Sequence, residues 1–231
     1  MLNELELTGR SRTHVAQRDD LGAAIHRDAL DAFLAMRAAA AAEGLDIAIA
    51  SAFRDFGAQQ RIWDLKFRGE RPLYDAEGNV RDHASLSPCE LVEAILCWSA
   101  LPGASRHHWG TEIDVYDRAA MPEGYRLLLL PSEAAAGGVF HRLHGWLDEH
   151  MQEYGFYRPY ATYRGGVLPE PWHLSYAPVS VTATQALTLD LLERTVSSSS
   201  VLGKAHVLER LAEIHARYVA SVDLPDGSRV E

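Results

Sequence analysis

Apolar residues recur at helical intervals over residues 21–43 and then alternate with other residues along the next segment. The helical stripe predicts one long amphipathic helix, and it consists of Leu30, Phe33, Leu34, Ala38 and Ala41, with Arg37 as its one charged member. Gly44 follows the stripe and is suited to end the helix. Alternation over residues 45–51 predicts a half-buried strand that leads to Arg54. The polar residues 1–20 are predicted to form an irregular arm.

Later patterns predict three more helices and two more strands. One helix begins at Ser87, because Ser-Pro-Cys-Glu combines a capping box with a proline at the first helical position. The other predicted helices cover residues 57–67 and 139–151, and the predicted strands cover residues 110–117 and 170–176. The segments 68–82 and 118–138 are turn-rich or irregular, apart from an apolar run at 127–130 that could form a strand.

The pattern changes after Tyr176. Two amphipathic helices are predicted over residues 184–195 and 202–219, separated by the serines at 197–200. They would either pack on the rest of the chain as a hairpin or present a surface to a partner. We therefore divide the sequence into an arm (1–20), a main domain (21–178) and a helical C-terminal extension (179–231).

Composition narrows the classes of function. The 231 residues are 47% hydrophobic and 23% charged, which is ordinary for a globular protein. A formal net charge of −10 argues against a nucleic-acid-binding protein, because such proteins usually carry a basic face. No apolar run reaches the roughly 18–20 residues needed to span a bilayer. The first twenty residues also lack the apolar centre of a signal peptide.

These features predict a cytoplasmic protein as the sequence is written, or a protein of the periplasm or cell envelope whose leader was removed. Cys89 and Cys97 are eight positions apart on one predicted helix, about 12 Å by helical rise. They are therefore too far apart to form a disulfide with each other. The cysteines give no indication of an oxidising compartment.

The segment 105–114, Ser-Arg-His-His-Trp-Gly-Thr-Glu-Ile-Asp, is the first candidate for chemistry. His107 and Asp114 would lie about 10 Å apart on a helix and more than about 20 Å apart on a straight strand, too far to share one metal ion. A turn at Gly110, where a positive φ is accessible, would bring His107 back over a strand that carries Asp114. The same two residues could instead form a simple hydrogen bond between a loop and a strand.

A third metal ligand is available at His173, the last residue of Glu-Pro-Trp-His. Two imidazoles and a carboxylate form the donor set of a catalytic zinc site, with one position left open. Glu170 precedes His173 by three positions, but Pro171 disfavours a helical conformation at Glu170. The segment therefore differs from the helical zinc motif of other peptidases. By itself, Glu170 could also be a surface carboxylate.

Three motifs together resemble those of the zinc D-alanyl-D-alanine carboxypeptidase and dipeptidase family, the VanY-like and VanX-like LAS peptidases of the bacterial cell wall. They are Ser105-x-His107-x-x-Gly110-x-x-x-Asp114, Glu170-x-Trp172-His173, and Ser51-Ala-Phe-Arg54 followed by Gln59. The resemblance extends from about residue 20 to Tyr176. It implies an α+β fold with a small, mainly antiparallel sheet and flanking helices, as in hedgehog and DD-peptidase domains. The helical C-terminal extension would be added to this fold.

The resemblance also implies how the metal site is built. His107, Asp114 and His173 would bind one Zn²⁺ per chain. Glu170 would act as general base and then as general acid. His108 stands beside His107, but the register of the motif places the ligand at His107. His108 is therefore expected in the cleft or behind the ligands.

Other residues would contact the substrate. By the same resemblance, Arg54 would stabilise the tetrahedral oxyanion as a fixed cation. Gln59 and Ser105 would position Arg54 or bind the substrate carboxylate. The sequence departs from the family pattern at Glu112, where a small residue is usual, and at Ser175, where an arginine is frequent. Neither departure removes a ligand or the base, but both could alter the surface that faces the substrate.

The implied function is zinc-dependent hydrolysis of the terminal D-Ala peptide bond of a peptidoglycan-type stem peptide. Alternatives within the enzyme class are a D-Ala-D-Ala dipeptidase and a wall endopeptidase. Outside that class, the chain could be a non-catalytic zinc-binding module, like the related hedgehog domains, or a purely structural domain. The presence of Arg54 and Glu170 together with all three ligands argues against the zinc-binding module, and analysis of bound metal would test the structural domain.

Overall fold

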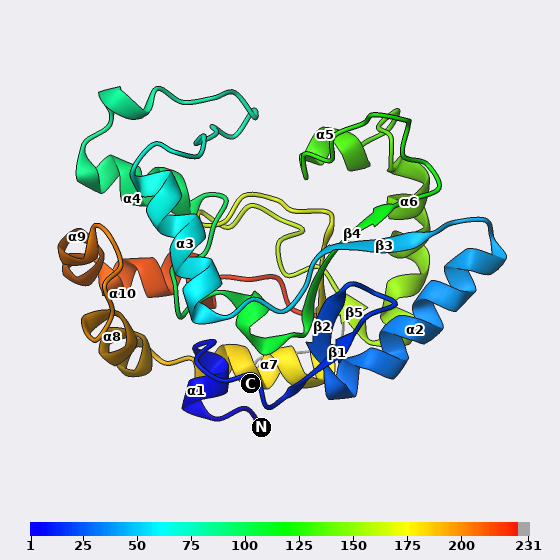
Figure 1. Cartoon of the computed structure of the whole chain (residues 1–231), viewed down its shortest axis with the longest axis horizontal. Helices are drawn as coiled ribbons and strands as arrows, with labels where there is room; N and C mark the ends of the chain where they lie inside the picture. Colours follow the sequence, from blue (N-terminus) through cyan, green and yellow to red (C-terminus); the bar gives the residue numbers. More distant parts are fainter. Residues whose placement is uncertain (226–231) are drawn as a thin grey trace.

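The centre of the molecule is a four-stranded antiparallel sheet with the strand order β3-β4-β6-β5. Figure 1 shows it in a computed structural model that describes residues 1–225. The strands are β3 (Ile47–Ser51), β4 (Glu112–Asp117), β6 (His173–Tyr176) and β5 (Phe156–Tyr157). A separate hairpin consists of β1 (Val15–Arg18) and β2 (Ala23–His26). Small antiparallel sheets surrounded by helices confirm the predicted α+β class.

A first hydrophobic core lies between the sheet and two helices, α2 (Arg27–Ala42) and α6 (His141–His150), at the right of Figure 1. Because side chains alternate along a strand, Ile113 and Val115 of β4 point into this core while Asp114 points away from it. The strand thus separates a packed side from a side that can carry chemistry.

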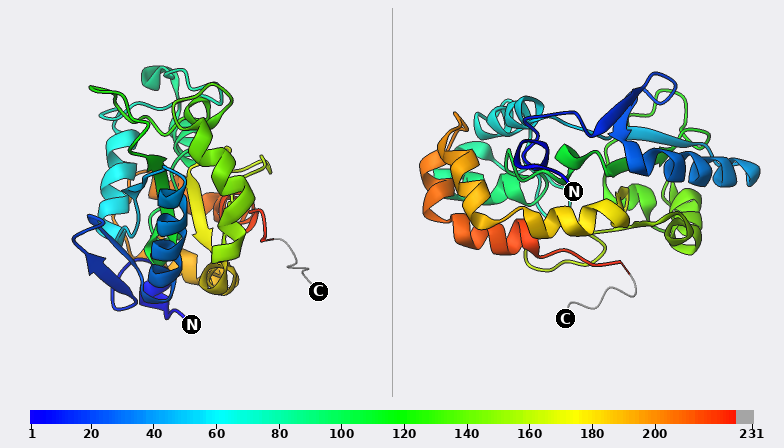
Figure 2. Two further views of the ribbon diagram at one scale, coloured as in Figure 1. Left: turned by 90° about the vertical axis from the view of Figure 1, so that its right-hand side faces the viewer. Right: turned by 90° about the horizontal axis from the view of Figure 1, so that it is seen from below.

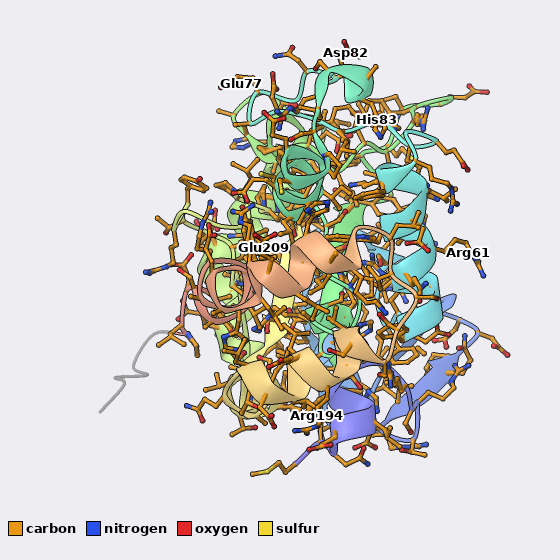
Figure 3. The ribbon with its side chains drawn as sticks, turned by 90° about the vertical axis from the view of Figure 1, so that its left-hand side faces the viewer. Arg61, Glu77, Asp82, His83, Arg194 and Glu209 are labelled. Carbon is orange, nitrogen blue, oxygen red and sulfur yellow. The ribbon has the colours of Figure 1, made fainter. Side chains whose placement is uncertain are left out.

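A second core lies at the left of Figure 1, where α3 (Phe56–Phe67) and α4 (Pro88–Leu96) pack against the C-terminal helices. Figure 3 views this side, with Arg61 on α3, Arg194 on α8 and Glu209 on α9. The C-terminal helices are α8 (Leu189–Ser197), α9 (Lys204–Glu209) and α10 (Leu211–Ile214), followed by the π-helical turn His215–Ala220. The extension is therefore helical, as predicted, and it packs on the rest of the chain.

Helix α7 (Ala177–Ala186) follows β6 directly and crosses the lower side of the molecule toward the C-terminal helices (Figure 2). The single helix predicted for residues 184–195 is wrong, because α7 ends before Leu187 and α8 begins after it. The side chain of Thr188 caps α8 by accepting a hydrogen bond from the backbone N–H of Leu191. The predicted break at 197–200 is confirmed, but residues 202–219 form several short helical segments instead of one helix.

The N-terminal predictions are wrong in two respects. Residues 1–20 form α1 (Glu4–Leu7) and β1 instead of an irregular arm. The helix predicted from residue 21 begins only at Arg27, since β2 occupies the preceding residues. The physical reason is strand pairing: β2 bonds to β1 in a hairpin, and the His26 N–H donates to the carbonyl of the distant Gly110 at 2.8 Å. Local periodicity does not reveal such contacts.

Elsewhere the local patterns predict the elements well. The capping box at Ser87 is present, with Glu90 bonded back to the Ser87 N–H at 2.9 Å. Residues 127–130 are not a strand but an irregular segment that precedes the short helix α5 (Pro131–Ala134). Across residues 1–225, no helix is both long enough and apolar enough to span a bilayer.

Candidate metal centre and active-site cleft

Two of the predicted ligands are direct neighbours in the sheet. Asp114 of β4 pairs with His173 of β6 in the antiparallel register, so both side chains project from the same face. Asp114 Oδ1 lies 3.0 Å from His173 Nδ1. Strand pairing therefore brings together two residues that are 59 positions apart in the sequence.

His107 reaches the same place from a 3₁₀ helix, Arg106–Trp109, that ends at Gly110 with φ +66°. A Cβ atom at Gly110 would lie 2.5 Å from a methyl carbon of Val15 and 2.9 Å from the backbone nitrogen of His26. Only glycine fits this close approach and this positive φ. The predicted turn is thus confirmed, and His107 Nε2 lies 3.3 Å from Asp114 Oδ2.

His107, Asp114 and His173 form a buried group whose ligand atoms all lie within 4.8 Å of one another. In each histidine the other ring nitrogen has its own partner. His107 Nδ1 donates to the Ala52 carbonyl at 2.8 Å, and His173 Nε2 donates to Glu112 Oε2 at 2.9 Å. These bonds fix both rings so that one nitrogen of each faces Asp114, as metal-binding histidines require. The donor set therefore fits a divalent metal ion such as zinc.

Glu112 lies behind this group and is fully buried. Its carboxylate also accepts a hydrogen bond from Ser175 at 2.8 Å and forms an ion pair with Arg106 at 3.2 Å. Burial alone would raise the pKa of Glu112, but the Arg106 guanidinium and the bonds from His173 and Ser175 lower it to about 2. Neither Glu112 nor Ser175 lines the cleft. The expectation that these two departures alter the substrate-facing surface is therefore wrong.

Arg106 connects this network to the start of the C-terminal extension. Its guanidinium donates to Thr184 of α7 at 2.7 Å and to the Tyr157 hydroxyl of β5 at 3.1 Å. The carboxylate of Glu112 and the guanidinium of Arg106 are both removed from water, so each depends on the other for charge compensation. Residues of β4, β5, β6 and α7 thereby hold the network that lies behind the metal-ligand candidates, on the side away from the cleft.

The charges around the ligands are strongly coupled. Burial disfavours a charged His173, but the hydrogen bonds and charges of Asp114 and Glu112 outweigh burial and raise its pKa to about 10. Burial also disfavours a charged Asp114, yet His107 and His173 lower its pKa well below the usual range. A positive charge is therefore stabilised at the point where the three side chains meet.

Glu170 faces the same point from the turn before β6. Its Oε2 lies 3.5 Å from His173 Nδ1. The backbone is held there because the Glu170 N–H donates to the Tyr160 carbonyl at 3.0 Å and the His173 N–H donates to the Glu170 carbonyl at 3.1 Å. Burial raises the pKa of Glu170 to about 7, against the opposing charges of His173 and Arg54. A carboxyl group with such a pKa can both accept and donate a proton near neutrality.

Arg54 follows β3 and is held from both ends. Its N–H donates to the His107 carbonyl at 3.1 Å, and its own carbonyl accepts a hydrogen bond from His108 Nδ1 at 2.6 Å. At the other end, its guanidinium donates to Gln59 Oε1 at 2.8 Å, and Gln59 Nε2 donates to the Ala100 carbonyl at 2.6 Å. Gln59 therefore positions Arg54, and His108 supports it from behind.

The candidate site opens into one cleft with a volume of about 620 Å³. Its lining includes the three metal-ligand candidates, Arg54, Glu170 and Ser105. Trp98 and Trp172 stack at 6.5 Å between ring centroids and form part of one wall. The loops that contain Gly78 and residues 128–130 border the cleft (top of Figure 1). Ser105 is buried at this lining, where a substrate could contact it.

Comparison with known proteins decides the family. A family model described as VanY, D-alanyl-D-alanine carboxypeptidase, matches residues 22–179. The chain belongs to the VanY family. The three motifs that first indicated this family are the same segments that meet in the cleft.

Two curated relatives show how far the similarity reaches. An uncharacterised protein of Haemophilus influenzae is 34% identical over 121 residues, which cover 52% of this chain and 92% of that protein. A D-alanyl-D-alanine carboxypeptidase of Enterococcus faecalis is 28% identical over 144 residues, or 61% of this chain and 44% of that protein. The chain thus matches less than half of the enterococcal enzyme.

Solved structures of VanY proteins share the fold. VanYB in complex with D-alanine-D-alanine is 25% identical with a TM-score of 0.51, and the alignment covers 82% of this chain and 92% of that one. A point mutant of a VanY D,D-pentapeptidase in complex with Zn(II) is also 25% identical, with a TM-score of 0.50 and coverages of 76% and 84%. The second of these relatives is a peptidase that holds zinc, and the first binds D-alanine-D-alanine.

Sequence reasoning missed three residues of the VanY-type site, of which only Lys66 leaves a signal in the sequence pattern. Alternation along the strand places Glu112 on the substrate side, although it supports His173. Nothing in the sequence distinguishes Tyr160 from its neighbouring tyrosines, but its ring lies 5.1 Å from the His173 ring and lines the cleft. Lys66 of α3 also lines the cleft. Its spacing of seven positions from Gln59 could have indicated a shared helix face.

Proposed function

We propose that this VanY-family chain is a zinc-dependent D-alanyl-D-alanine carboxypeptidase that releases the terminal D-alanine of a peptidoglycan-type stem peptide. The observation that carries the proposal is the convergence of five side chains in one cleft. They are the metal-ligand candidates His107, Asp114 and His173, with Glu170 and Arg54 beside them. A purely structural metal site would not require the last two.

His107, Asp114 and His173 would hold the zinc ion, with Glu112 and the Ala52 carbonyl orienting the two imidazoles. When bound, zinc would supply a Lewis acid and increase the acidity of water at its open position. The similarity to the zinc-bound VanY D,D-pentapeptidase supports this choice of metal.

Glu170 is placed to move the proton. It would remove a proton from the attacking water as the oxygen adds to the scissile carbonyl carbon. It would then give that proton to the departing amine as the carbon–nitrogen bond breaks. The products are the shortened peptide with a new carboxylate and free D-alanine. Burial raises the pKa of Glu170 above its ordinary value, which suits a group that first accepts and then donates a proton.

Arg54 would stabilise the oxyanion that develops on the scissile carbonyl oxygen. Its guanidinium is held by Gln59 and its backbone by His107 and His108, so little reorganisation is needed during the reaction. Burial of the Arg54 side chain lowers its pKa, and a fixed cation in such surroundings has a stronger effect than one on the surface.

The substrate is tested by an assay of the purified zinc-loaded chain against three substrates: D-Ala-D-Ala, a stem pentapeptide and intact sacculi. Release of D-alanine from the pentapeptide supports the proposal. Cleavage of the dipeptide alone would reassign the chain as a dipeptidase, and release of cross-linked fragments would make it an endopeptidase. Absence of turnover on all three would favour a zinc-binding module.

A further inference from the structure

Lys66 lies on the wall of the cleft, beyond the residues that the proposed mechanism uses. Gln59, Ile62 and Lys66 occur at helical positions i, i+3 and i+7 of α3 and therefore share one face. Gln59 is fully buried beneath Arg54, whereas Ile62 and Lys66 line the cleft. Seven residues of helix correspond to about 10 Å, so Lys66 extends the same wall away from Arg54.

The ammonium group of Lys66 is not paired with a carboxylate. Its hydrogen bond goes to the Ser99 hydroxyl at 2.7 Å. Within residues 1–225, no carboxylate oxygen lies within 4.0 Å of Lys66, Arg54 or Arg71, and all three line the cleft. This acidic chain, with its formal net charge of −10, thus keeps three unpaired cations at one cavity.

Removing an ammonium group from water without a counter-ion costs free energy. Burial lowers the pKa of Lys66 to about 8, in part opposed by Glu170 and reinforced by Arg71 and Arg54. Glu170, Arg71 and Arg54 are thus the charged groups that act on the pKa of Lys66, and all three line the same cleft. A carboxylate bound beside Lys66 would remove this penalty, because charge-assisted hydrogen bonds are among the stronger polar contacts.

We propose that Lys66, with Arg71 nearby in the same cleft, forms a binding subsite for a carboxylate of the peptide substrate. The subsite is separate from the oxyanion position at Arg54, and it rests on the proposed function for the identity of the substrate. The carboxylate is either the terminal one, on the departing D-alanine, or one carried by an amino acid further along the stem. The two carboxylates have the same chemistry, and the experiment below distinguishes between them.

Three peptides make the test. The first ends in D-Ala-D-Ala with a free carboxylate, the second is its C-terminal amide, and the third replaces the acidic residues of the stem by neutral isosteres. KM and kcat are measured for wild type, Lys66→Met and Lys66→Arg, after circular dichroism has shown that each variant is folded. Lys204→Met is the matched control, since Lys66 and Lys204 are the two lysines of the chain and Lys204 bonds to backbone carbonyls of residues 197 and 199.

Lys66→Met should raise KM for the free acid by about 10–100-fold, the range expected for loss of a hydrogen bond to a charged group. Lys66→Arg should raise KM less, and Lys204→Met should leave it unchanged. A wild type that prefers the acid to the amide identifies the terminal carboxylate as the ligand. A wild type that instead disfavours the neutral-stem peptide identifies a stem carboxylate. In either case Lys66→Met should abolish that preference.

Two results would overturn the subsite. One is an unchanged KM in Lys66→Met for all three peptides. The other is an equal change for all three with an altered pH profile of kcat, which would mean that Lys66 acts only through the charge of Glu170. If the wild type does not hydrolyse any of the peptides, the proposed function is wrong, but this result does not decide whether the subsite exists. Calorimetric binding of the same peptides to wild type and Lys66→Met then still tests the subsite.

Discussion

Glu112→Gln is the change that most directly tests whether the Glu112 carboxylate supports His173, one of the three metal-ligand candidates. The glutamine side chain could still accept a hydrogen bond from His173 Nε2, but it would no longer carry the charge that lies 2.9 Å from that nitrogen. Loss of such a partner typically lowers metal affinity about 10–100-fold. We therefore expect zinc affinity, measured by competition with a chromophoric chelator, to fall within this range.

The same change leaves Arg106 buried without its counter-ion at 3.2 Å. Removing one partner of a buried ion pair destabilises a protein by about 3–5 kcal/mol. The metal-free Glu112→Gln variant should therefore unfold at lower temperature. A double variant, Glu112→Gln with Arg106→Gln, removes both charges and should recover part of this stability without recovering zinc affinity.

Ser175→Ala is the matched control for the Glu112 prediction. It removes the 2.8 Å hydrogen bond to Glu112, the 2.9 Å bond from Arg106 and the 2.7 Å contact with Ser180, but leaves both charges and the contact between Glu112 and His173. We expect a loss of stability of about 1–3 kcal/mol, because buried polar groups lose a partner, and little change in zinc affinity. Wild-type zinc affinity in folded Glu112→Gln would refute the idea that this carboxylate tunes His173. Recovery of zinc affinity in the double variant would show that the unpaired charge of Arg106 alone caused the loss of zinc affinity in Glu112→Gln.

Three further outcomes follow from the site. His107→Ala and His173→Ala should lose bound zinc in metal analysis, whereas His108→Ala should retain it; full zinc occupancy in His107→Ala would contradict the ligand set. Arg54→Lys should fold normally but lower kcat by about 10²–10³, because lysine lacks the planar fork of donors that would stabilise the oxyanion, and an unchanged rate would show that Arg54 does not act in catalysis. The lowered pKa of Lys66, about 8, means that its positive charge is lost as pH rises through this value, so kcat/KM for a carboxylate-bearing peptide should fall above about pH 8 in wild type. The same fall in Lys66→Met would assign this pH dependence to another group.

Local sequence properties predicted the parts of the site that depend on spacing and turn chemistry. Gly110 required a positive φ, and alternation along β4 separated Asp114 from the apolar residues on either side. His173 was predicted at a strand, and pairing with β4 places it opposite Asp114. The family resemblance supplied the register that distinguishes His107 from His108, which spacing alone did not.

The rest of the site depends on contacts between distant segments. Glu112 shares a strand face with Asp114, so alternation placed both toward the substrate. In the structure that face is divided, because Arg106, Ser175 and α7 cover Glu112 while Asp114 remains at the cleft. No local pattern indicates which part of a face another element will cover.

The prediction for the N-terminal residues, which form a hairpin, was wrong because it also missed contacts made outside the segment. Apolar spacing over residues 21–43 suits a helix throughout, yet residues 23–26 gain a strand partner in β1 and a hydrogen bond to Gly110. Pairing of this kind overrides helix propensity, which contributes well under about 1 kcal/mol per ordinary residue. The hairpin also packs Val15 against Gly110, and it thereby supports the turn that carries His107.

The central claim is that Glu170 would act as the proton carrier at the candidate metal site of this VanY-family chain, and Glu170→Gln tests it most directly. Zinc content and the rate of D-alanine release from a stem pentapeptide should be measured together for wild type and variant. We predict unchanged zinc content and a fall in kcat of about 10²–10⁴, the range typical of general acid–base catalysis. Loss of zinc in the variant would make Glu170 a ligand, and equal rates in the two proteins would contradict its role as the proton carrier.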